Sequence, residues 1–190
     1  YGLKADIVEV EVPAGNILLG QSFNDLMDVH HMYIIGSYFK GQRWISPVVE
    51  TEITTPCRLA ILGRKKVIEE MADIYGLNIL PQLDMFAEEF APTKSGVAEI
   101  VIPPDSQVIG KTAQGLALRK TYGMSMLAIH RGEETFSHVE TENHEASRIG
   151  RVPLRAGDTL VVHVQWENLT RINREKDFVV VTSDFPQEEL

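Results

Sequence analysis

The sequence has 190 residues, of which 44% are hydrophobic and 24% charged, and its formal net charge of −9 marks an acidic globular protein. This charge argues against binding to nucleic acid or to an anionic lipid surface, because both attract a basic protein face. No apolar stretch reaches the roughly 18 residues of a membrane span, so no direct membrane insertion of this chain is expected. The single cysteine, Cys57, excludes an internal disulfide and fits a reducing compartment.

The first half of the chain predicts a small α+β unit. In chain order, the pattern predicts a strand at 8–12, a helix at 22–30, a strand at 32–39, a hairpin strand after the turn "KGQ", a strand at 58–62 and a helix over 67–74. Pro13 ends the first strand because proline has no N–H group to donate to the ladder. Ser22 and Asp25 form a capping-box pattern at the start of the first helix, and Gly76 is a typical stop for the second.

The second half of the chain repeats this order. "AEIVIPPDSQVIGKT" (98–112) aligns with "VEVEVPAGNILLGQS" (8–22) at an offset of 90, so that Pro103 falls on Pro13 and Gly110 on Gly20. Farther on the offset is 101, because a polar stretch at 137–147, predicted to be an exposed loop, adds about ten residues to the second copy. The repeat predicts strands at 98–102, 124–130 and 159–164, a hairpin strand after "RGEE", a helix at 112–122 and a helix around Leu169 and Ile172.

The expected fold class is therefore α+β, with two tandem units. Each is predicted to be a mainly antiparallel sheet of about four strands with two helices. We expect a first domain at 1–88, a linker at 89–96 and a second domain at 97–190, because the stretch between the copies carries charge, proline and glycine. One unit of this size builds only a small core, so pairing of the two units or homodimerisation is expected.

The residues Gly110-Lys111-Thr112 end like a phosphate-binding loop, but a second interpretation covers both copies. The loop motif Gly-x-x-x-x-Gly-Lys-Ser/Thr needs glycine where this chain has Asp105, and the first copy has Gln21 in place of the lysine. A proline-ended strand, a glycine bend and a Ser or Thr helix cap account for both copies at once. The sequence therefore predicts a structural turn and not a nucleotide hydrolase.

No catalytic or metal constellation stands out in the sequence. The histidines His30, His31, His138 and His144 match no metal-ligand spacing, so no metal site is predicted. Neither a nucleophile elbow, Gly-x-Ser-x-Gly, nor a dinucleotide fingerprint, Gly-x-Gly-x-x-Gly, occurs. We therefore expect no enzyme activity and no bound cofactor.

A basic and aromatic group, Arg119, Lys120 and Tyr122, lies at the end of the helix predicted at 112–122. One interpretation of the group is structural, because cations favour the C-terminus of a helix. The other is a pocket for a small anionic ligand. The first copy would then lack this pocket, because it has no arginine at the same place.

Nearly all of the second copy resembles the TrkA-C domain, the C-terminal lobe of domains that regulate potassium conductance. The resemblance is carried by Ile102-Pro103 before the turn, Gly110-Lys111-Thr112 before the helix, "YGMSMLAIHRG" (122–132) and Gly157-Asp158 before the fourth strand. The first copy resembles a divergent member, in which Pro56-Cys57 replaces the Gly-Asp pair. Tandem TrkA-C domains are similar to the cytosolic insert of permeases in the divalent anion:sodium symporter family.

This resemblance implies a non-enzymatic regulatory module on the cytoplasmic face of the cell membrane, with the transmembrane domain of a permease as its partner. Some members of the domain family bind cyclic di-AMP between two lobes. Their contacts correspond by position to Leu118, Arg119 and Ser125, and Ser125 stands in place of an asparagine. With Tyr122, these residues are the candidate site for a small anionic or nucleotide effector. Two other roles stay open: a purely structural dimerisation module, and the regulatory lobe of a potassium channel or cation antiporter.

Overall fold

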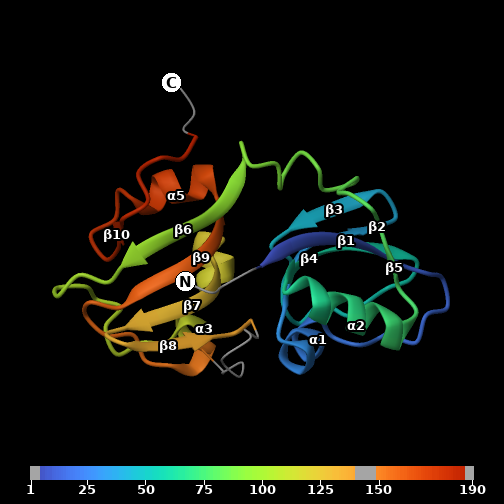
Figure 1. Cartoon of the computed structure of the whole chain (residues 1–190), viewed down its shortest axis with the longest axis horizontal. Coiled ribbons are helices and arrows are strands. Elements are labelled where there is room, and N and C mark those ends of the chain that lie inside the picture. The colour runs from blue at the N-terminus through green and yellow to red at the C-terminus, as the bar shows by residue number, and fades with distance from the viewer. Residues whose placement is uncertain (1–4, 140–148, 187–190) are drawn as a thin grey trace. The chain divides into compact units, whose positions relative to one another are not determined.

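The structure, a computed structural model, describes residues 5–139 and 149–186 (Figure 1). The chain divides into two compact units at Ala87 and Glu88. Each unit contains one five-stranded sheet. Every pair of neighbouring strands in both sheets is antiparallel. The two units are described one at a time below, because each has its own sheet, helices and core.

The first unit follows the predicted order of elements. It contains β1 (Asp6–Val12), α1 (Phe23–His30), β2 (Tyr33–Phe39), β3 (Gln42–Ile45), β4 (Cys57–Gly63), α2 (Lys65–Tyr75) and β5 (Asn78–Ile79). Its strand order is β3-β2-β4-β1-β5. β1 pairs with β4 along its whole length, from Asp6 opposite Gly63 to Val12 opposite Cys57. The strands predicted at 8–12 and 58–62 are therefore two neighbours inside the sheet.

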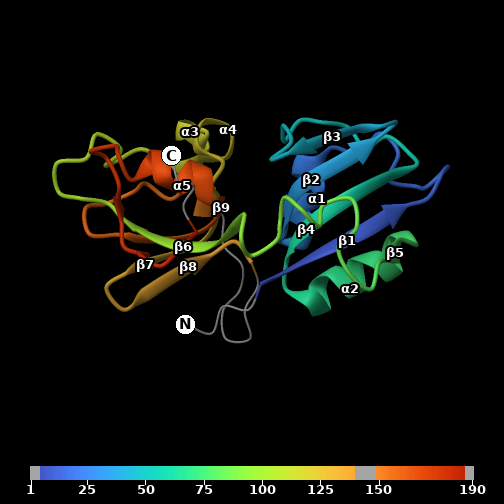
Figure 2. The same cartoon turned by 90° about the horizontal axis from the view of Figure 1, so that it is seen from above.

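The second unit has the same topology. It contains β6 (Ser95–Val101), α3 (Ala113–Leu116), α4 (Leu118–Tyr122), β7 (Ser125–Arg131), β8 (Glu134–Ser137), the 3-10 turn η1 (Ile149–Arg151), β9 (Thr159–Gln165), α5 (Trp166–Ile172) and β10 (Val179–Val180). Its strand order is β8-β7-β9-β6-β10, which matches the first unit strand for strand. Figure 2 shows α3, α4 and α5 on one side of this sheet.

A β-bulge confirms the repeat at a level that the sequence pattern does not reach. One residue is inserted into the ladder at Ile35 in β2 and at Leu127 in β7. The carbonyl of Ile35 accepts a hydrogen bond from the N–H of Ser46 at 2.9 Å, and that of Leu127 accepts one from His138 at 3.2 Å. Because a bulge re-aims the strand that carries it, both second strands bend at the same point.

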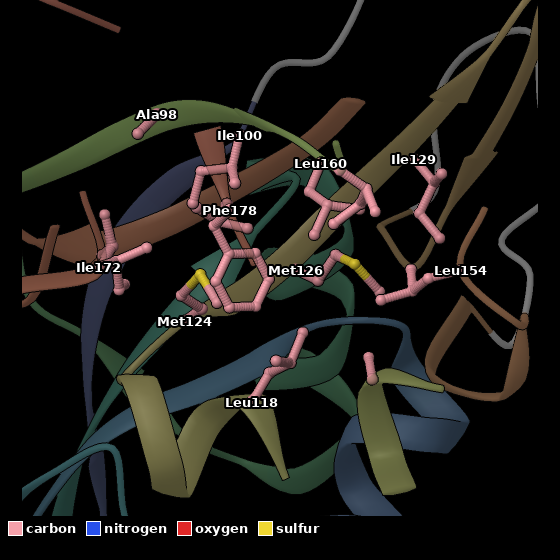
Figure 3. Close-up of a cluster of buried hydrophobic side chains, with 14 of the residues drawn as sticks. Ala98, Ile100, Leu118, Met124, Met126, Ile129, Leu154, Leu160, Ile172 and Phe178 are labelled. Carbon is pink, nitrogen blue, oxygen red and sulfur yellow. The ribbon is translucent and has the colours of Figure 1, made fainter. Parts of the chain in front are cut away.

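The core of each unit lies between its helices and one face of its sheet. In the second unit, Ile100, Met126 and Leu160 extend from three neighbouring strands, and Leu118 and Ile172 extend from α4 and α5 (Figure 3). In the first unit the cluster includes Val10, Ile34, Leu59, Met27 and Met71. Strand residues enter the core at alternate positions, as the period of a half-buried strand requires.

The structure corrects the predicted fold in two places. Each sheet has five strands and not about four, because the two-residue strands β5 and β10 pair with β1 and β6. The helix predicted at 112–122 is divided into α3 and α4, because Ala117 has a left-handed backbone with φ 50°. A left-handed residue cannot continue a right-handed helix. Most of the loop predicted at 137–147 lies outside the described residues.

The predicted helix caps are confirmed. The Ser22 hydroxyl accepts a hydrogen bond from the N–H of Asp25 at 3.0 Å, which satisfies one of the orphan donors of α1. The Thr112 hydroxyl accepts from the N–H of Gly115 at the same distance, 3.0 Å, at the start of α3. Gly76 ends α2 with φ 67°, a conformation that glycine adopts without steric cost.

Candidate functional site

The turn after the first strand has the same hydrogen bonds in both copies. The N–H of Gly110 donates to the carbonyl of Leu154 at 2.7 Å, and the N–H of Gly20 donates to that of Ile53 at 2.9 Å. The N–H of Lys111 donates to the carbonyl of Val108, in the same turn, at 3.0 Å. A phosphate loop presents such backbone donors to its ligand, whereas here they are used by the protein. The prediction of a structural bend is confirmed.

The four candidate ligand residues lie on two elements of the second unit. Leu118, Arg119 and Tyr122 belong to α4, and Ser125 is the first residue of β7. Leu118 is 2% exposed and its side chain points into the core cluster (Figure 3). Arg119 follows it on the helix and is partly buried. Leu118 thus serves the core of the unit in this structure.

Ser125 lies on the other face of the sheet from Leu118. In the ladder, Ser125 is opposite His163 of β9, whereas the next residue, Met126, belongs to the core. Because successive side chains of a strand point to opposite faces, Ser125 and His163 share the face away from the core. The structure therefore does not bring Leu118 and Ser125 together. Arg119 and Tyr122, at a spacing of i and i+3 on α4, share one side of the helix.

The surroundings of Tyr122 are acidic. Its ring packs edge-on against Phe178, with the ring centroids 5.2 Å apart. Burial raises the pKa of the Tyr122 hydroxyl, and so do the charge and hydrogen bond of Glu175 and the charge of Asp177. Negative charge at this end of the helix opposes a second anion there. Within the candidate set, Arg119 is therefore the group suited to an anionic ligand.

The Gly157-Asp158 motif forms a buried polar cluster in the second unit. The carboxylate of Asp158, 1% exposed, accepts from Nε and Nη2 of Arg131, each at 2.8 Å. It also accepts from the backbone N–H of Arg155 at 2.8 Å, and Arg131 donates to the carbonyl of Pro153 at 2.9 Å. This bidentate pair ties the loop before β9 to the end of β7. The sequence analysis singled out Gly157-Asp158 but did not identify Arg131 as the partner of Asp158.

The first copy replaces this ion pair by a neutral group. Phe39 and Cys57 stand at the positions of Arg131 and Asp158 in the ladders of the two sheets. Cys57 is buried, and burial raises the pKa of its thiol to about 12. The ammonium of Lys40 lies 5.3 Å from the centroid of the Phe39 ring. The loop before β4 is therefore held without a buried charge.

His163 is a buried histidine that the sequence analysis did not single out. It is 5% exposed, and its ring lies 5.9 Å from that of Phe90, measured between centroids. Burial lowers the pKa of His163 to about 4, so the imidazole is neutral at physiological pH. The first copy has Leu62 at the equivalent ladder position. The alignment of the two copies could have revealed His163, because it places this histidine where the first copy has the apolar Leu62.

The structure describes three of the four histidines considered as metal ligands, namely His30, His31 and His138. His30 is hydrogen-bonded to the hydroxyl of Tyr75, with 2.7 Å between Nε2 and the oxygen, and the two rings meet edge-on. Among the residues that the structure describes, no group of three or more His, Cys, Asp or Glu side chains is arranged to hold a metal ion. His144 lies outside the described residues.

The first unit contains a second polar cluster, centred on Glu9 of β1. Its side chain is 0% exposed and accepts from Nη1 of Arg58 at 3.0 Å. It also accepts from the backbone N–H groups of Asp84, Met85 and Phe86 at 2.9, 3.2 and 3.2 Å. The Arg58 guanidinium pairs in addition with the exposed carboxylate of Asp84. Residues 84–86 directly precede the division between the units.

Comparison with known proteins gives one family match and one curated relative. The TrkA-C domain matches residues 97–177, which make up most of the second copy. The uncharacterized transporter sll0640 of Synechocystis sp. is 23% identical over 189 residues. That alignment covers 95% of this chain and 29% of the relative. Within the described part of the chain, no helix has both the length and the apolar character to cross a bilayer.

Three solved structures are also similar to this chain. The RCK domain of GsuK is 12% identical, with 90% of this chain and 63% of that chain covered and a TM-score of 0.37. The GsuK channel is 12% identical, with 90% and 52% covered and a TM-score of 0.39. BusR of S. agalactiae, in complex with its promoter DNA, is 17% identical, with 57% and 47% covered and a TM-score of 0.31.

Proposed function

We propose that this chain is a regulatory module of a membrane transporter and lies on the cytoplasmic side of the membrane. The observation that carries the proposal is the extent of the match to the transporter relative, which runs over 189 residues and so includes both copies. The TrkA-C match to residues 97–177 supports the regulatory role of the second copy. The partner of the module is then the transmembrane part of the same protein.

The transporter class that we propose is the sodium-coupled divalent anion symporter, as the resemblance of the tandem copies implies. The module is non-enzymatic and acts through a population shift between arrangements of its units or of paired chains. An effector regulates transport only if it binds one arrangement more tightly than the other. The two sites, effector and transport, are then linked by one coupling free energy.

The effector that we propose is a small anion or nucleotide bound by the second copy. Arg119 supplies the positive charge, and the carboxylates of Glu175 and Asp177 near Tyr122 disfavour an anion at the end of α4, so binding depends on Arg119 within the candidate set. Leu118 acts from the core, by holding α4 in place. Ser125 lies on the opposite face of the sheet, so it does not share the surface of Arg119.

Thermal melts of the chain against nucleotides, cyclic dinucleotides and small anions test this function. A ligand that binds the native state raises the melting temperature as its concentration passes the dissociation constant. We expect at least one compound of the panel to do so, and we expect Arg119→Ala to abolish the rise. Lys111→Ala is the matched control, because Lys111 is an exposed cation of the same unit outside α4.

The same experiment separates the proposed sensor from a purely structural dimerisation module. A structural module shows no rise with any compound, and its melting temperature increases with protein concentration because dimerisation stabilises the folded chain. Sedimentation at two protein concentrations identifies that case. Such a result would replace the effector part of the proposal.

A further inference from the structure

Residues 84–86 are held against the sheet of the first unit and are called the connector strap here, because they open the stretch between the units. Three consecutive backbone N–H groups of the strap donate to one carboxylate, that of Glu9, at 2.9 to 3.2 Å. Arg58 joins the cluster from β4 and pairs with both Glu9 and Asp84. A carboxylate buried this fully needs such donors, since an unsatisfied charge in the interior is costly.

An apolar contact fixes the same strap independently. Phe86 is 0% exposed. A Cβ atom added at Gly36 would lie 2.7 Å from Cε1 of Phe86 and 3.2 Å from the Cβ of Ala60. The absent side chain at Gly36 therefore makes the space that the phenylalanine ring fills. Two different kinds of contact, one polar and one apolar, hold the strap.

The second copy has the glutamate but not the strap. Glu99 of β6 is the equivalent of Glu9, while Thr159 stands in the place of Arg58 and Ala128 in the place of Gly36. Burial lowers the pKa of His130 and the charge of Glu99 raises it, so Glu99 acts on this histidine in place of an arginine on the neighbouring strand. The strap is therefore not required by the fold, because the second copy builds the same sheet without it.

The other end of the connector is fixed on the second unit. The indole N–H of Trp166 donates to the carbonyl of Pro92 at 2.8 Å, and its backbone N–H donates to that of Lys94 at 2.9 Å. The ring of Trp166 also fills the space above Gly96, where an added Cβ would lie 2.5 Å away. Phe90 is 6% exposed, and its ring centroid lies 5.9 Å from that of His163, so the second unit also holds the connector at this residue. The stretch between Phe86 and Phe90 thus joins the two fixed ends.

We propose that Glu9 is a positioning residue that latches the connector to the first unit. With the latch closed, residues 84–86 move with the first sheet, and the connector leaves the first unit only after Phe86. With the latch open, the connector gains three residues of free length, each spanning at most about 3.5 Å. The latch thereby sets how tightly the motions of the two units are coupled, which is what the proposed regulatory function requires.

Hydrogen exchange on the full 190-residue chain tests the latch, with Glu9→Gln and its matched control Glu99→Gln. A glutamine keeps the size of the side chain but loses the charge and half of its acceptors, so the strap amides open more often. We expect exchange at 84–86 to accelerate about tenfold in Glu9→Gln, in line with one lost charged hydrogen bond. Wild-type rates at the strap in Glu9→Gln, or equal acceleration there in Glu99→Gln, would overturn the proposal.

A milder variant covers the case in which Glu9→Gln unfolds the first unit, seen as lost protection throughout β4. Asp84→Asn removes only the ion pair between Arg58 and an exposed carboxylate, whose side chain is 61% exposed, and leaves Glu9 in place. We expect the strap amides to exchange about threefold faster in this variant while β4 stays protected. Unchanged exchange at the strap in Asp84→Asn would count against the latch.

Spin labels test the consequence for the connector. Cysteines introduced by Lys66→Cys and Lys111→Cys, both exposed positions, carry one label on each unit in a Cys57→Ser background. We expect Glu9→Gln to broaden the distance distribution and Glu99→Gln to leave it as in the parent. If Glu9→Gln speeds exchange at the strap but leaves the distance distribution between the two labels unchanged, the proposed coupling of the units through the connector is wrong. This readout needs no effector and no transport, so it fails or succeeds independently of the proposed function.

Discussion

The two units of this chain have the same strand topology but differ in the side chains on one face of their sheets. Both have the order of strands, the bulge in the second strand and the hydrogen bonds of the glycine turn. The first sheet holds a strap through Glu9, Arg58 and the space at Gly36. The second sheet has Ala128 in place of Gly36, and the neutral His163 opposite Ser125. The glycine turns and the bulge are therefore the same in both copies, whereas the side chains on the sheet faces differ.

The loop before the fourth strand shows the same division of roles. In the second unit it is held by the bidentate pair between Arg131 and Asp158, and in the first by the buried, neutral Cys57. The fourth strand therefore begins beside a buried ion pair, after Gly157 with φ 84°, in one copy, and beside a buried thiol, after the cis Thr55-Pro56 peptide, in the other. The comparison shows that the same strand can follow two different loops, and that the buried ion pair occurs in the copy matched by the TrkA-C domain.

The largest expected effect is the loss of the buried ion pair. Asp158→Ala leaves the Arg131 guanidinium without its carboxylate and the N–H of Arg155 without its acceptor, so we expect a loss of about 4 kcal/mol in the free energy of unfolding. Cys57→Ala at the matching position of the first unit should cost about 1 kcal/mol. Urea denaturation measures both. Equal costs would contradict a distinct stabilising role for the pair.

The second effect is the part of the pH dependence that comes from His163 of the second unit. The pKa of His163 is lowered to about 4, whereas an unfolded histidine titrates near 6.5. Between these values the unfolded chain binds a proton that the native state does not, so stability falls as the pH falls from about 6.5 to about 4. At about 1.4 kcal/mol per pKa unit, the loss amounts to about 3 kcal/mol.

His163→Leu installs the side chain that the first copy has at Leu62 and removes this titration. Urea denaturation at pH 7 and at pH 4.5 should then show a smaller acid-induced loss of stability than in the unchanged protein. The other titratable groups are the same in the unchanged protein and in His163→Leu, so the difference between the two pH dependences isolates His163. Identical pH dependences would refute the assignment.

The third effect concerns Gly36, whose missing side chain leaves space for the ring of Phe86, and its counterpart Ala128. Gly36→Ala places a methyl group 2.7 Å from Cε1 of Phe86, which must then move. We expect a loss of about 2 kcal/mol from this overpacking. The reverse change in the second copy, Ala128→Gly, meets no such neighbour and should cost about 1 kcal/mol through backbone entropy. Thermal unfolding compares them, and a neutral Gly36→Ala would show that Phe86 is not seated as described.

The smallest effects concern the features that the copies share. Ser22→Ala and Thr112→Ala each remove the hydroxyl that caps a helix, and each should cost about 1 kcal/mol. The exchanges Ser22→Thr and Thr112→Ser keep the acceptor and should be nearly neutral. Chemical denaturation checks all four. A large difference between the two alanine variants would mean that the caps are not equivalent.

The sequence predicted the fold well where its signals are local. Pro13, Gly20 and Ser22 each fix the backbone within a few residues, and their copies recur at a constant offset. The two-residue strands β5 and β10 carry no periodicity, so they could not be predicted. The break at Ala117 was missed because alanine favours a helix and rarely adopts positive φ.

The candidate site was less predictable, because its residues are placed by contacts distant in sequence. Leu118 and Ser125 are seven positions apart, yet a helix end and the alternation of a strand put them on opposite faces of the sheet. The partners of Glu9 lie at Arg58 and in the strap, 49 and 75 to 77 residues away. Neither arrangement has a local pattern that a single sequence displays.

Transport by the parent protein tests the central claim most directly. Membrane vesicles that contain the full-length transporter, or the same protein with this tandem chain replaced by a short flexible linker, are assayed for sodium-driven uptake of sulfate, phosphate and dicarboxylates. The account predicts that both proteins transport, and that only the full-length form changes its rate when the compound found in the thermal melts is added. An identical response of the two proteins to that compound would contradict a regulatory role for the chain.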